Sequence, residues 1–287
     1  MEELPPKIHF MYDPGKEPDA SFARMLVREL GQARLENADK VVSIGGDGML
    51  LRALHNAPGK KVAGIVSPGS ASRGFWTNRG IENAADLTVL FQKAGSYKVK
   101  PLRLDITFAD GSQKTRYAYN DASVRWIDKD LSACLRAEFD VPETDVSVQS
   151  MLVNLKVTFA SAVLGPRRVM GGALLFATAL GSTAMNRSNG GPSLDIRNEG
   201  IILNGLGISE PAKGFNPVVN GSSTVFDVEV LSPDKRPVMA VYDSFAVKNN
   251  EKNSPVAALR VSMAEDRAAQ LVLADDPGLR AYSAMMP

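Results

Sequence analysis

The sequence predicts an α/β domain followed by a β-rich domain. Short apolar runs alternate with amphipathic stretches in the first part of the chain, whereas strand-like segments separated by turns predominate after Val99. The length of 287 residues also exceeds the usual size of one domain. We therefore expect an α/β domain on a parallel sheet at 1–98 and a β-rich domain at 99–263.

Strand and helix alternate in the N-terminal part. Ile8–Tyr12 is a short apolar run closed by a Pro-Gly turn, and Asp19 is placed to act as the N-cap of an amphipathic helix. Val41–Ile44 has the pattern of a buried strand, Gly45–Gly48 turns into a second helix, and Lys61–Val66 is a third strand. This order implies parallel strands joined by crossover helices.

The second part has the pattern of antiparallel strands. Leu102–Phe108 alternates apolar and polar residues, Asp110-Gly111 marks a turn, and Thr115–Tyr119 returns, which predicts a hairpin. Further strands are expected at Ser123–Ile127, Leu135–Val141, Leu152–Phe159, Leu174–Thr178, Gly200–Leu203, Thr224–Leu231, Val238–Tyr242 and Leu259–Met263.

Composition narrows the class of protein. Hydrophobic residues make up 44% and charged residues 23%, as expected for a globular chain with a large core. The net charge of +1 argues against a nucleic-acid partner. The longest apolar stretch, Val169–Ala184, is interrupted by glycines and hydroxyl residues, so we expect no membrane span. A single cysteine, Cys134, and no signal-peptide pattern indicate a cytoplasmic protein.

The string Gly45-Gly46-Asp47-Gly48 lies between an apolar strand and a helix. Such a turn presents backbone N–H groups and the positive end of a helix dipole to a ligand, and glycines let the backbone approach phosphate oxygens. The alternative is an ordinary tight turn in which Asp47 caps the next helix. The string is short enough that it does not distinguish these interpretations by itself.

If a phosphate bound at this turn is transferred to a hydroxyl, Asp47 is the carboxylate placed to act on that hydroxyl. Moving a proton from a ribose hydroxyl, with a pKa of roughly 12, to an ordinary aspartate is uphill by about 11 kcal/mol. Asp47 therefore cannot deprotonate the hydroxyl in advance. It can orient the hydroxyl and accept its proton late, as a loose transition state allows.

Further motifs follow in a fixed order. They are Gly64-Ile65-Val66 through Gly74-Phe75-Trp76-Thr77, then Asn120-Asp121, then Gly181-Ser182-Thr183-Ala184, then Gly190-Gly191-Pro192. In order and spacing this set resembles the NAD kinase family over nearly the whole chain. The Gly-Gly-Asp-Gly string is shared with lipid kinases, whereas the later motifs are more particular to NAD kinases. The resemblance implies phosphorylation of the 2′-hydroxyl of the adenosine ribose of NAD or NADH, with ATP or polyphosphate as donor and Mg²⁺ bound to its phosphates.

The resemblance also assigns residues to roles. Asp47 matches the family's catalytic aspartate, and the resemblance also implies that it contacts NAD. Phosphate binding is implied for Gly45, Gly46 and Gly48. Gly48 is also implied to contact NAD. Further NAD contacts are implied for Phe75, Asn120, Asp121, Thr183, Ala184, Met185 and Ser188. The family fold is a Rossmann-like α/β domain plus a β-rich domain, and we expect the segment from about 264 to 287 to pack back on the first domain. A homodimer or homotetramer is implied as well.

Local patterns alone leave these positions open. Asn120-Asp121 could accept from two ribose hydroxyls or form a plain turn. Gly181–Ala184 could open a helix toward a ligand or be an ordinary capped helix start, and Phe75 could stack on a base or belong to the core. No cluster of Cys and His suggests a protein-held metal.

Two positions depart from the family pattern. Gly171-Gly172-Ala173 stands where the family has Asp-Gly, and Met185 replaces a tyrosine. The first removes a carboxylate and the second an aromatic face and a hydroxyl. These departures keep two alternatives open, a lipid or other small-molecule kinase on the same scaffold and a catalytically weak NAD-binding regulatory protein.

Overall fold

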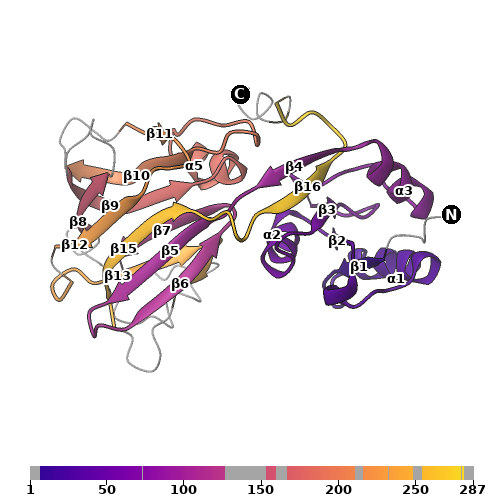
Figure 1. Ribbon diagram of the computed structural model, residues 1–287, viewed down its shortest axis with the longest axis horizontal. Helices are drawn as coiled ribbons and strands as arrows, with labels where there is room; N and C mark the ends of the chain where they lie inside the picture. Colours follow the sequence, from indigo (N-terminus) through magenta and orange to yellow (C-terminus); the bar gives the residue numbers. More distant parts are fainter. Residues whose placement is uncertain are drawn as a thin grey trace. The chain divides into compact units, whose positions relative to one another are not determined.

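The computed structural model describes residues 7–72, 74–126, 153–159, 167–210, 216–231, 233–247, 254–278 and 280. These residues form two compact units (Figure 1). The first contains the described residues of 1–100, 194–198 and 265–287, and the second contains those of 101–193 and 199–264.

The first unit is built on a five-stranded sheet with the order β1-β2-β3-β16-β4. The pairs β1–β2, β2–β3 and β3–β16 are parallel, whereas β4 runs antiparallel to β16. In Figure 1 the yellow strand β16, from near the end of the chain, lies beside β4. The strands are β1 (Ile8–Met11), β2 (Lys40–Ile44), β3 (Lys61–Ile65), β4 (Gly95–Val99) and β16 (Ala269–Leu273). The helices are α1 (Asp19–Leu30), the 3₁₀ helix η1 (Leu35–Asn37), α2 (Asp47–Asn56) and α3 (Ala84–Lys93).

Alternation along the strands places helices on both faces of this sheet. Val42 and Ile44 of β2 share one buried cluster with residues of α1 and α3. Side chains at odd positions of β2 point to the other face. There Leu50 of α2 lies close to Gly64 of β3, so α2 covers this second face. The predicted α/β domain on a mainly parallel sheet is confirmed.

The predicted cap of the first helix is wrong. Pro18 occupies the N-cap of α1 and makes no side-chain cap bond. Asp19 is the first helical residue and is 1% exposed. Its carboxylate accepts a hydrogen bond from Ser67 Oγ and lies 3.7 Å from Lys16 Nζ. The carboxylate therefore joins α1 to the loop after β3 instead of satisfying the helix's own N–H groups.

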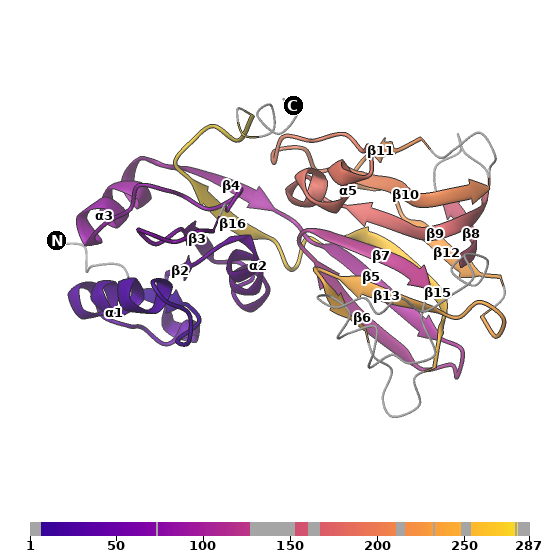
Figure 2. The same cartoon turned by 180° about the vertical axis from the view of Figure 1, so that it is seen from behind.

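The second unit is an antiparallel sheet of eleven strands within the described residues. Its main path is β14-β13-β7-β9-β8-β12-β15-β5-β6, and β10 pairs with β9 and β11 (Figure 2). The strands are β5 (Leu102–Phe108), β6 (Gln113–Ala118), β7 (Asp121–Trp126), β8 (Val153–Phe159), β9 (Arg167–Ala177), β10 (Ile201–Glu210), β11 (Val218–Asn220), β12 (Phe226–Val230), β13 (Val238–Tyr242), β14 (Phe245–Ala246) and β15 (Val256–Met263).

The long strand β9 organises this sheet. One edge of β9 pairs with β8 over its first half and with β7 over its second half, and β10 covers the other edge. Phe176 of β9 and Phe226 of β12 are fully buried, with ring centroids 5.2 Å apart. The apolar cluster around them contains the inward-facing residues of β5, β12 and β15, so the predicted β-rich unit has its own core.

Most predicted strands exist, with shifted ends. The hairpin is confirmed as β5 and β6, and Gly111 adopts a φ of 82° in its turn. The strand expected at Leu174–Thr178 begins earlier, at Arg167, and the one expected at Gly200–Leu203 continues to Glu210. Cys134 and the strand expected at Leu135–Val141 lie outside the described residues.

Asn78 connects two strands of the first unit that are far apart in sequence. Its Nδ2 donates to the carbonyl oxygens of Gly64 (2.9 Å) and Val272 (3.0 Å), and its Oδ1 accepts from the Ala274 backbone N–H at 2.8 Å. The side chain is fully buried. One amide thus satisfies three backbone groups at the carboxyl ends of β3 and β16.

We predict that Asn78→Ala lowers the free energy of unfolding by about 2–4 kcal/mol, because the Val272 carbonyl oxygen and the Ala274 N–H lose their side-chain partner, whereas the Gly64 oxygen keeps the backbone N–H of residue 78. Asn83→Ala is the matched control, since exposed Asn83 caps α3 through a single bond to the Asp86 N–H and its loss costs about 1 kcal/mol. Urea denaturation of both variants measures the difference. Equal effects of the two substitutions would contradict this role of Asn78.

Candidate functional site

The Gly45–Gly48 turn connects β2 to α2 at the carboxyl end of the parallel strands. Gly45 has a φ of 137°, which a side chain rarely adopts, and Gly46 is the N-cap of α2. A Cβ on Gly46 would overlap the Ser72 hydroxyl, whereas a Cβ on Gly48 would meet no atom within 4 Å. The fold therefore explains why residues 45 and 46 are glycines. It does not explain the glycine at 48, where there is open space for a side chain.

Asp47 does not cap the helix that it begins. Its Oδ2 accepts from the Phe75 backbone N–H at 2.7 Å, and its Oδ1 accepts from the Trp76 N–H at 2.9 Å. No side-chain cap bond exists at the start of α2. The interpretation of Asp47 as an ordinary helix cap is therefore wrong, because its carboxylate is committed to a loop 28 residues further along the chain.

Burial raises the pKa of Asp47 above its usual value. The hydrogen bonds from Trp76 and Phe75 and the positive charge of Arg280 act in the opposite direction. Arg280 also holds the loop itself, because its Nη1 donates to the carbonyl oxygens of Phe75 (2.8 Å) and Thr77 (3.1 Å). Sequence reasoning missed Arg280, which follows the last strand of the unit by several residues.

The two aromatic residues of this loop have different environments. Trp76 is 3% exposed and belongs to the core, whereas Phe75 is only half-buried. Their rings meet edge to face with centroids 5.0 Å apart, so Trp76 fixes the orientation of Phe75. Of the pair, Phe75 is the ring that keeps surface for a ligand.

In the second unit, a carboxylate from another turn holds the backbone of the Asn120-Asp121 pair. Asp243 accepts from the backbone N–H groups of Tyr119 (2.8 Å), Asn120 (2.7 Å) and Asp121 (3.1 Å). Its own N–H donates to the Asp121 carbonyl oxygen at 2.9 Å. Sequence reasoning did not single out Asp243. An Asp-Ser pair between two strands is a turn signal, but its contact with residues more than 120 positions earlier leaves no local trace.

Asp121 is a buried carboxyl group with a perturbed pKa. Burial, followed by the negative charge of Asp243, raises its pKa to about 7, while Arg125 acts to lower it. Asp121 is 8% exposed. Its protonation state therefore changes in the neutral range, which is unusual for an aspartate.

The Gly181–Ala184 segment packs directly on the Asn120-Asp121 pair. Thr178 donates from Oγ1 to the Tyr119 carbonyl oxygen (2.6 Å) and from its backbone N–H to the Asn120 carbonyl oxygen (3.1 Å). A Cβ on Gly181 would overlap that same Asn120 oxygen, so only glycine fits there. The structure thus brings these two predicted motifs together.

The other residues predicted in this segment are accessible. The 3₁₀ helix η3 (Leu180–Thr183) is followed by the short helix α5 (Met185–Ser188). Thr183 and Ala184 are half-buried, whereas Met185 (38% exposed) and Ser188 lie at the surface. All four lie on the chain segment that begins at Gly181, whose backbone packs against the Asn120 carbonyl oxygen.

The Gly171-Gly172-Ala173 departure lies inside β9. A Cβ on Gly171 would stand 2.7 Å from the Gly207 carbonyl oxygen of β10, and one on Gly172 would stand 3.0 Å from the Leu206 oxygen. Next to this point the register between β9 and β10 shifts. The close approach of β10 explains glycine at 171, so this departure is coupled to the irregular pairing of the two strands.

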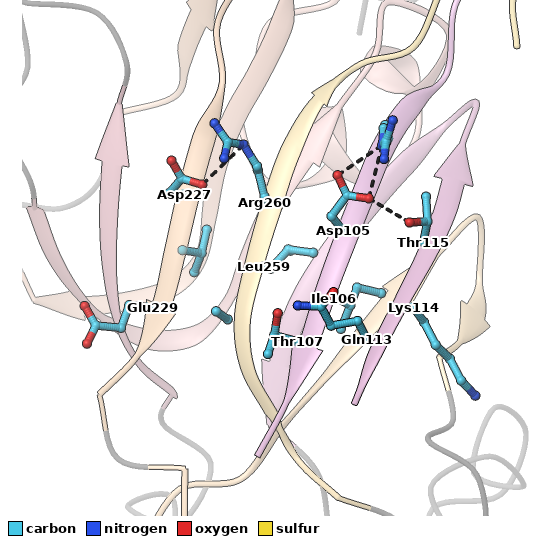
Figure 3. Close-up of a pocket in the computed structure, with 13 residues that line it drawn as sticks. Asp105, Ile106, Thr107, Gln113, Lys114, Thr115, Asp227, Glu229, Leu259 and Arg260 are labelled. Carbon is cyan, nitrogen blue, oxygen red and sulfur yellow. Dashed lines mark hydrogen bonds and ion pairs between the residues drawn. The ribbon is translucent and has the colours of Figure 1, made fainter. Parts of the chain in front are cut away.

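A cavity of about 620 Å³ in the second unit contains none of the predicted residues. It lies on the solvent-facing side of β5, β6, β12 and β15 (Figure 3). Arg103 contacts Asp105 (3.0 Å) and Arg260 contacts Asp227 (3.6 Å), so the main charges are paired. Its larger apolar members, Ile106, Val228 and Leu259, are buried in the core and offer no surface for a base. The predicted site residues lie instead around Asp47 in the first unit and around Asp121 in the second.

Metal-binding clusters and membrane-spanning helices are both absent from the described residues. Within these residues, no group of three or more His, Cys, Asp or Glu side chains is placed to hold a metal ion. No helix in the described part of the chain has the length and apolarity needed to cross a membrane.

Solved structures share the fold of this chain. Yeast NADH kinase complexed with NADH superposes with a TM-score of 0.73 at 14% identity, covering 99% of this chain and 88% of that one. An NAD kinase from Archaeoglobus fulgidus in complex with ATP superposes with a TM-score of 0.67 at 18% identity, covering 97% and 98%.

Curated sequences show the family. No family model matches the chain. The NAD kinase of Xanthomonas oryzae pv. oryzae is 27% identical over 275 residues, which are 95% of this chain and 93% of that protein. The NAD kinase of Caulobacter vibrioides is 30% identical over 262 residues, which are 91% of this chain and 88% of that protein. With both motif regions in place and this identity over almost the whole length, the chain belongs to the NAD kinase family.

Proposed function

We propose that this protein is an NAD kinase that transfers a phosphoryl group from ATP to the 2′-hydroxyl of the adenosine ribose of NAD or NADH. The observation that carries the proposal is the Asp47 carboxylate, held by two backbone N–H groups beside a glycine turn with open space at Gly48. Family membership supports the reaction, and the relative solved with ATP supports ATP as donor. Polyphosphate is an alternative donor.

Asp47 orients the acceptor hydroxyl in this proposal. Its two oxygens are fixed by the N–H groups of Phe75 and Trp76, which leaves further lone pairs to accept the ribose O–H. The ribose oxygen forms the new bond to phosphorus as the bond between the γ-phosphorus and its bridging oxygen breaks, and ADP leaves. The hydroxyl proton moves to Asp47 late, and the raised pKa of this carboxyl group makes the transfer less uphill than for an ordinary aspartate.

The glycine turn binds phosphate oxygens. The first N–H groups of α2 have no partner within the helix, and they carry the positive end of its dipole. Mg²⁺ supplies positive charge to the transferring phosphoryl group. We propose that the ion would be held mainly through the donor's phosphates, as is usual for Mg²⁺ at kinase sites.

The second unit binds the dinucleotide. Asn120 and Asp121 accept from ribose hydroxyls, and the accessible segment from Thr183 to Ser188 contacts the adenosine part. Met185 offers an exposed thioether instead of an aromatic ring, and a thioether also packs well on a base. In the first unit, the half-buried Phe75 ring contributes a further surface for NAD.

Location and assembly complete the proposal. One cysteine among 287 residues supports a reducing compartment, so we propose that the enzyme works in the cytoplasm. Assembly into a homodimer or homotetramer stays a prediction from the sequence.

We predict that Asp47→Asn abolishes NADP formation, with a loss of at least about a thousandfold in kcat, because the amide cannot take the hydroxyl proton. The fold should persist with a modest loss of stability, since one of the two N–H partners loses its acceptor. A coupled dehydrogenase assay measures the product. Asp86→Asn is the control, because Asp86 also accepts a backbone N–H in this unit, from Glu82, and should leave kcat unchanged. Full activity of Asp47→Asn would exclude the assigned role.

We predict opposite effects of Gly48→Ala on stability and activity. A Cβ there meets no protein atom and replaces a helical glycine, so stability should be unchanged or higher by up to about 1 kcal/mol. The same methyl group should hinder approach of phosphate and lower kcat/KM about a hundredfold. Gly221, which also has open space, provides the control variant Gly221→Ala. Normal kinetics of a folded Gly48→Ala enzyme would argue against phosphate binding at the turn.

We predict that Asp121 makes the folded protein less stable as pH rises from about 4 to about 7. The unfolded carboxyl group ionises near its model value of 3.8, whereas the folded one keeps its proton to about 7, so the native state binds more protons in this window. Between pH 5 and pH 8 this costs about 2–3 kcal/mol. Asp121→Asn should remove this part of the dependence, as measured by urea denaturation at both pH values. An unchanged difference between the two pH values would contradict it.

A further inference from the structure

We propose that Asp243 is the positioning residue of the dinucleotide site, which sets the affinity for NAD by fixing the backbone from Tyr119 to Asp121. This inference rests on the proposed function, because it takes Asn120 and Asp121 as NAD contacts. It adds a residue to which the reaction and the sequence motifs assign no role. The support comes from the hydrogen bonds, the backbone geometry and the packing around this one carboxylate.

The bonds of Asp243 cover every backbone N–H of the segment that leads into β7. One carboxylate oxygen accepts from Tyr119, and the other accepts from both Asn120 and Asp121. Tyr119 and Asn120 lie between β6 and β7, outside the strand ladders, and Asp243 supplies an acceptor for their N–H groups and for that of Asp121, the first residue of β7. Three charge-assisted bonds fix the φ and ψ angles of this segment and hence the directions of its side chains.

The turn that carries Asp243 is itself built to reach this segment. Asp243 and Ser244 have φ values of 44° and 68°, so two successive residues without glycine's freedom are left-handed. They connect β13 to β14, and Tyr242, the last residue of β13, pairs with Ala122 of β7. An aspartate tolerates the left-handed backbone conformation because its side chain is short and polar. Here that side chain accepts a hydrogen bond from Asp121, the first residue of the neighbouring strand β7.

The opposite side of the segment is held as well. Thr178 bonds the carbonyl oxygens of Tyr119 and Asn120, and Gly181 packs against the Asn120 oxygen. The Asp243 carboxylate thus binds the N–H groups of the segment, while Thr178 binds the carbonyl oxygens of Tyr119 and Asn120. The backbone is fixed from both sides, so in this proposal the side chains of Asn120 and Asp121 are left to contact the ligand. This arrangement preorganises a polar pair for a ligand.

The charge of Asp243 has a second effect, on the proton of Asp121. The charged groups that act on Asp121 are Asp243, from the turn, and Arg125 on its own strand, and its partner on β9 is the neutral Ala177. After burial, the charge of Asp243 is the larger cause of the raised pKa of Asp121, and the Arg125 charge acts in the opposite direction. Asp121 accepts ribose hydroxyls fully only when ionised. Affinity for NAD should therefore rise with pH through the neutral range.

The test uses the full chain with Asp243→Asn. We expect the dissociation constant for NAD, by calorimetry, and the KM for NAD to rise about tenfold or more, with the KM for ATP within about twofold of wild type. Backbone amides of 119–121 should exchange hydrogen faster. Asp227→Asn removes the same charge from an exposed position in the same unit and should change none of these quantities. A folded Asp243→Asn protein with unchanged NAD affinity, or with equal losses for NAD and ATP, would overturn the proposal.

The pH profile separates this role from a merely structural one. Asp243→Asn should lower the pH midpoint of NAD binding, because the negative charge that raises the pKa of Asp121 is gone. Asp243→Glu keeps the charge and should keep the midpoint while weakening NAD binding, and it also serves if the Asn variant fails to fold. Identical midpoints in the wild type and a folded Asn variant would contradict the proposal, as would full NAD affinity of the Glu variant. Wild-type protein that binds NAD but forms no NADP would instead refute the proposed function and leave the role of Asp243 standing.

Discussion

The whole candidate site depends on carboxylates that satisfy backbone N–H groups of irregular loops. A loop beside a sheet has no ladder partner for its N–H groups, and each unsatisfied group costs about 1–3 kcal/mol when buried. The Asp47 carboxylate accepts the N–H groups of the loop at Phe75 and Trp76, and the Asp243 carboxylate accepts those of the segment at Asn120. In both units a long-range contact from a carboxylate, and not local sequence, fixes the backbone around the predicted site residues.

The two carboxylates nevertheless serve different ends. Asp47 is both a structural acceptor and the group that meets the substrate in the proposed reaction, so its two oxygens are shared between the loop and the ribose. In the second unit, holding the backbone and contacting the substrate are assigned to two different carboxylates in the proposed site. Asp243 holds the backbone, and Asp121 remains available with a pKa near neutrality. Such division costs stability, because two carboxylates lie close together in a buried region, and sites that bind ligands commonly carry this cost.

Sequence patterns predicted the parts of this protein that obey local rules. The Gly45–Gly48 turn, the hairpin at Asp110-Gly111 and most strands of the second unit follow from glycine positions and from alternation of apolar residues. The helix Ala84–Lys93 and the strand Ala269–Leu273 were not predicted. The strand is held in the sheet by tertiary partners on both sides, which its own residues do not reveal.

The errors share one physical cause. Asp19 has the sequence of an N-cap, yet its carboxylate bonds Ser67, 48 residues away. Asp47 could equally have capped α2, and Asp243 carries no signal beyond a turn. A carboxylate near a helix start or a turn has a local partner and a distant partner of similar energy. The choice between them depends on which buried N–H groups the completed fold leaves unsatisfied, so it cannot be read from neighbouring residues.

Glycines give an independent way to separate folding from function. Gly45 needs its positive φ, Gly181 is required by the Asn120 carbonyl oxygen, and Gly171 is required by the approach of β10. For each of these, the fold alone accounts for the missing side chain. Gly48 is different, because it lies in a helix where glycine costs about 1 kcal/mol and where a Cβ would touch nothing. Glycine at this position is not required by the fold, which fits the proposal that the turn beside Asp47 binds the phosphate oxygens of the donor.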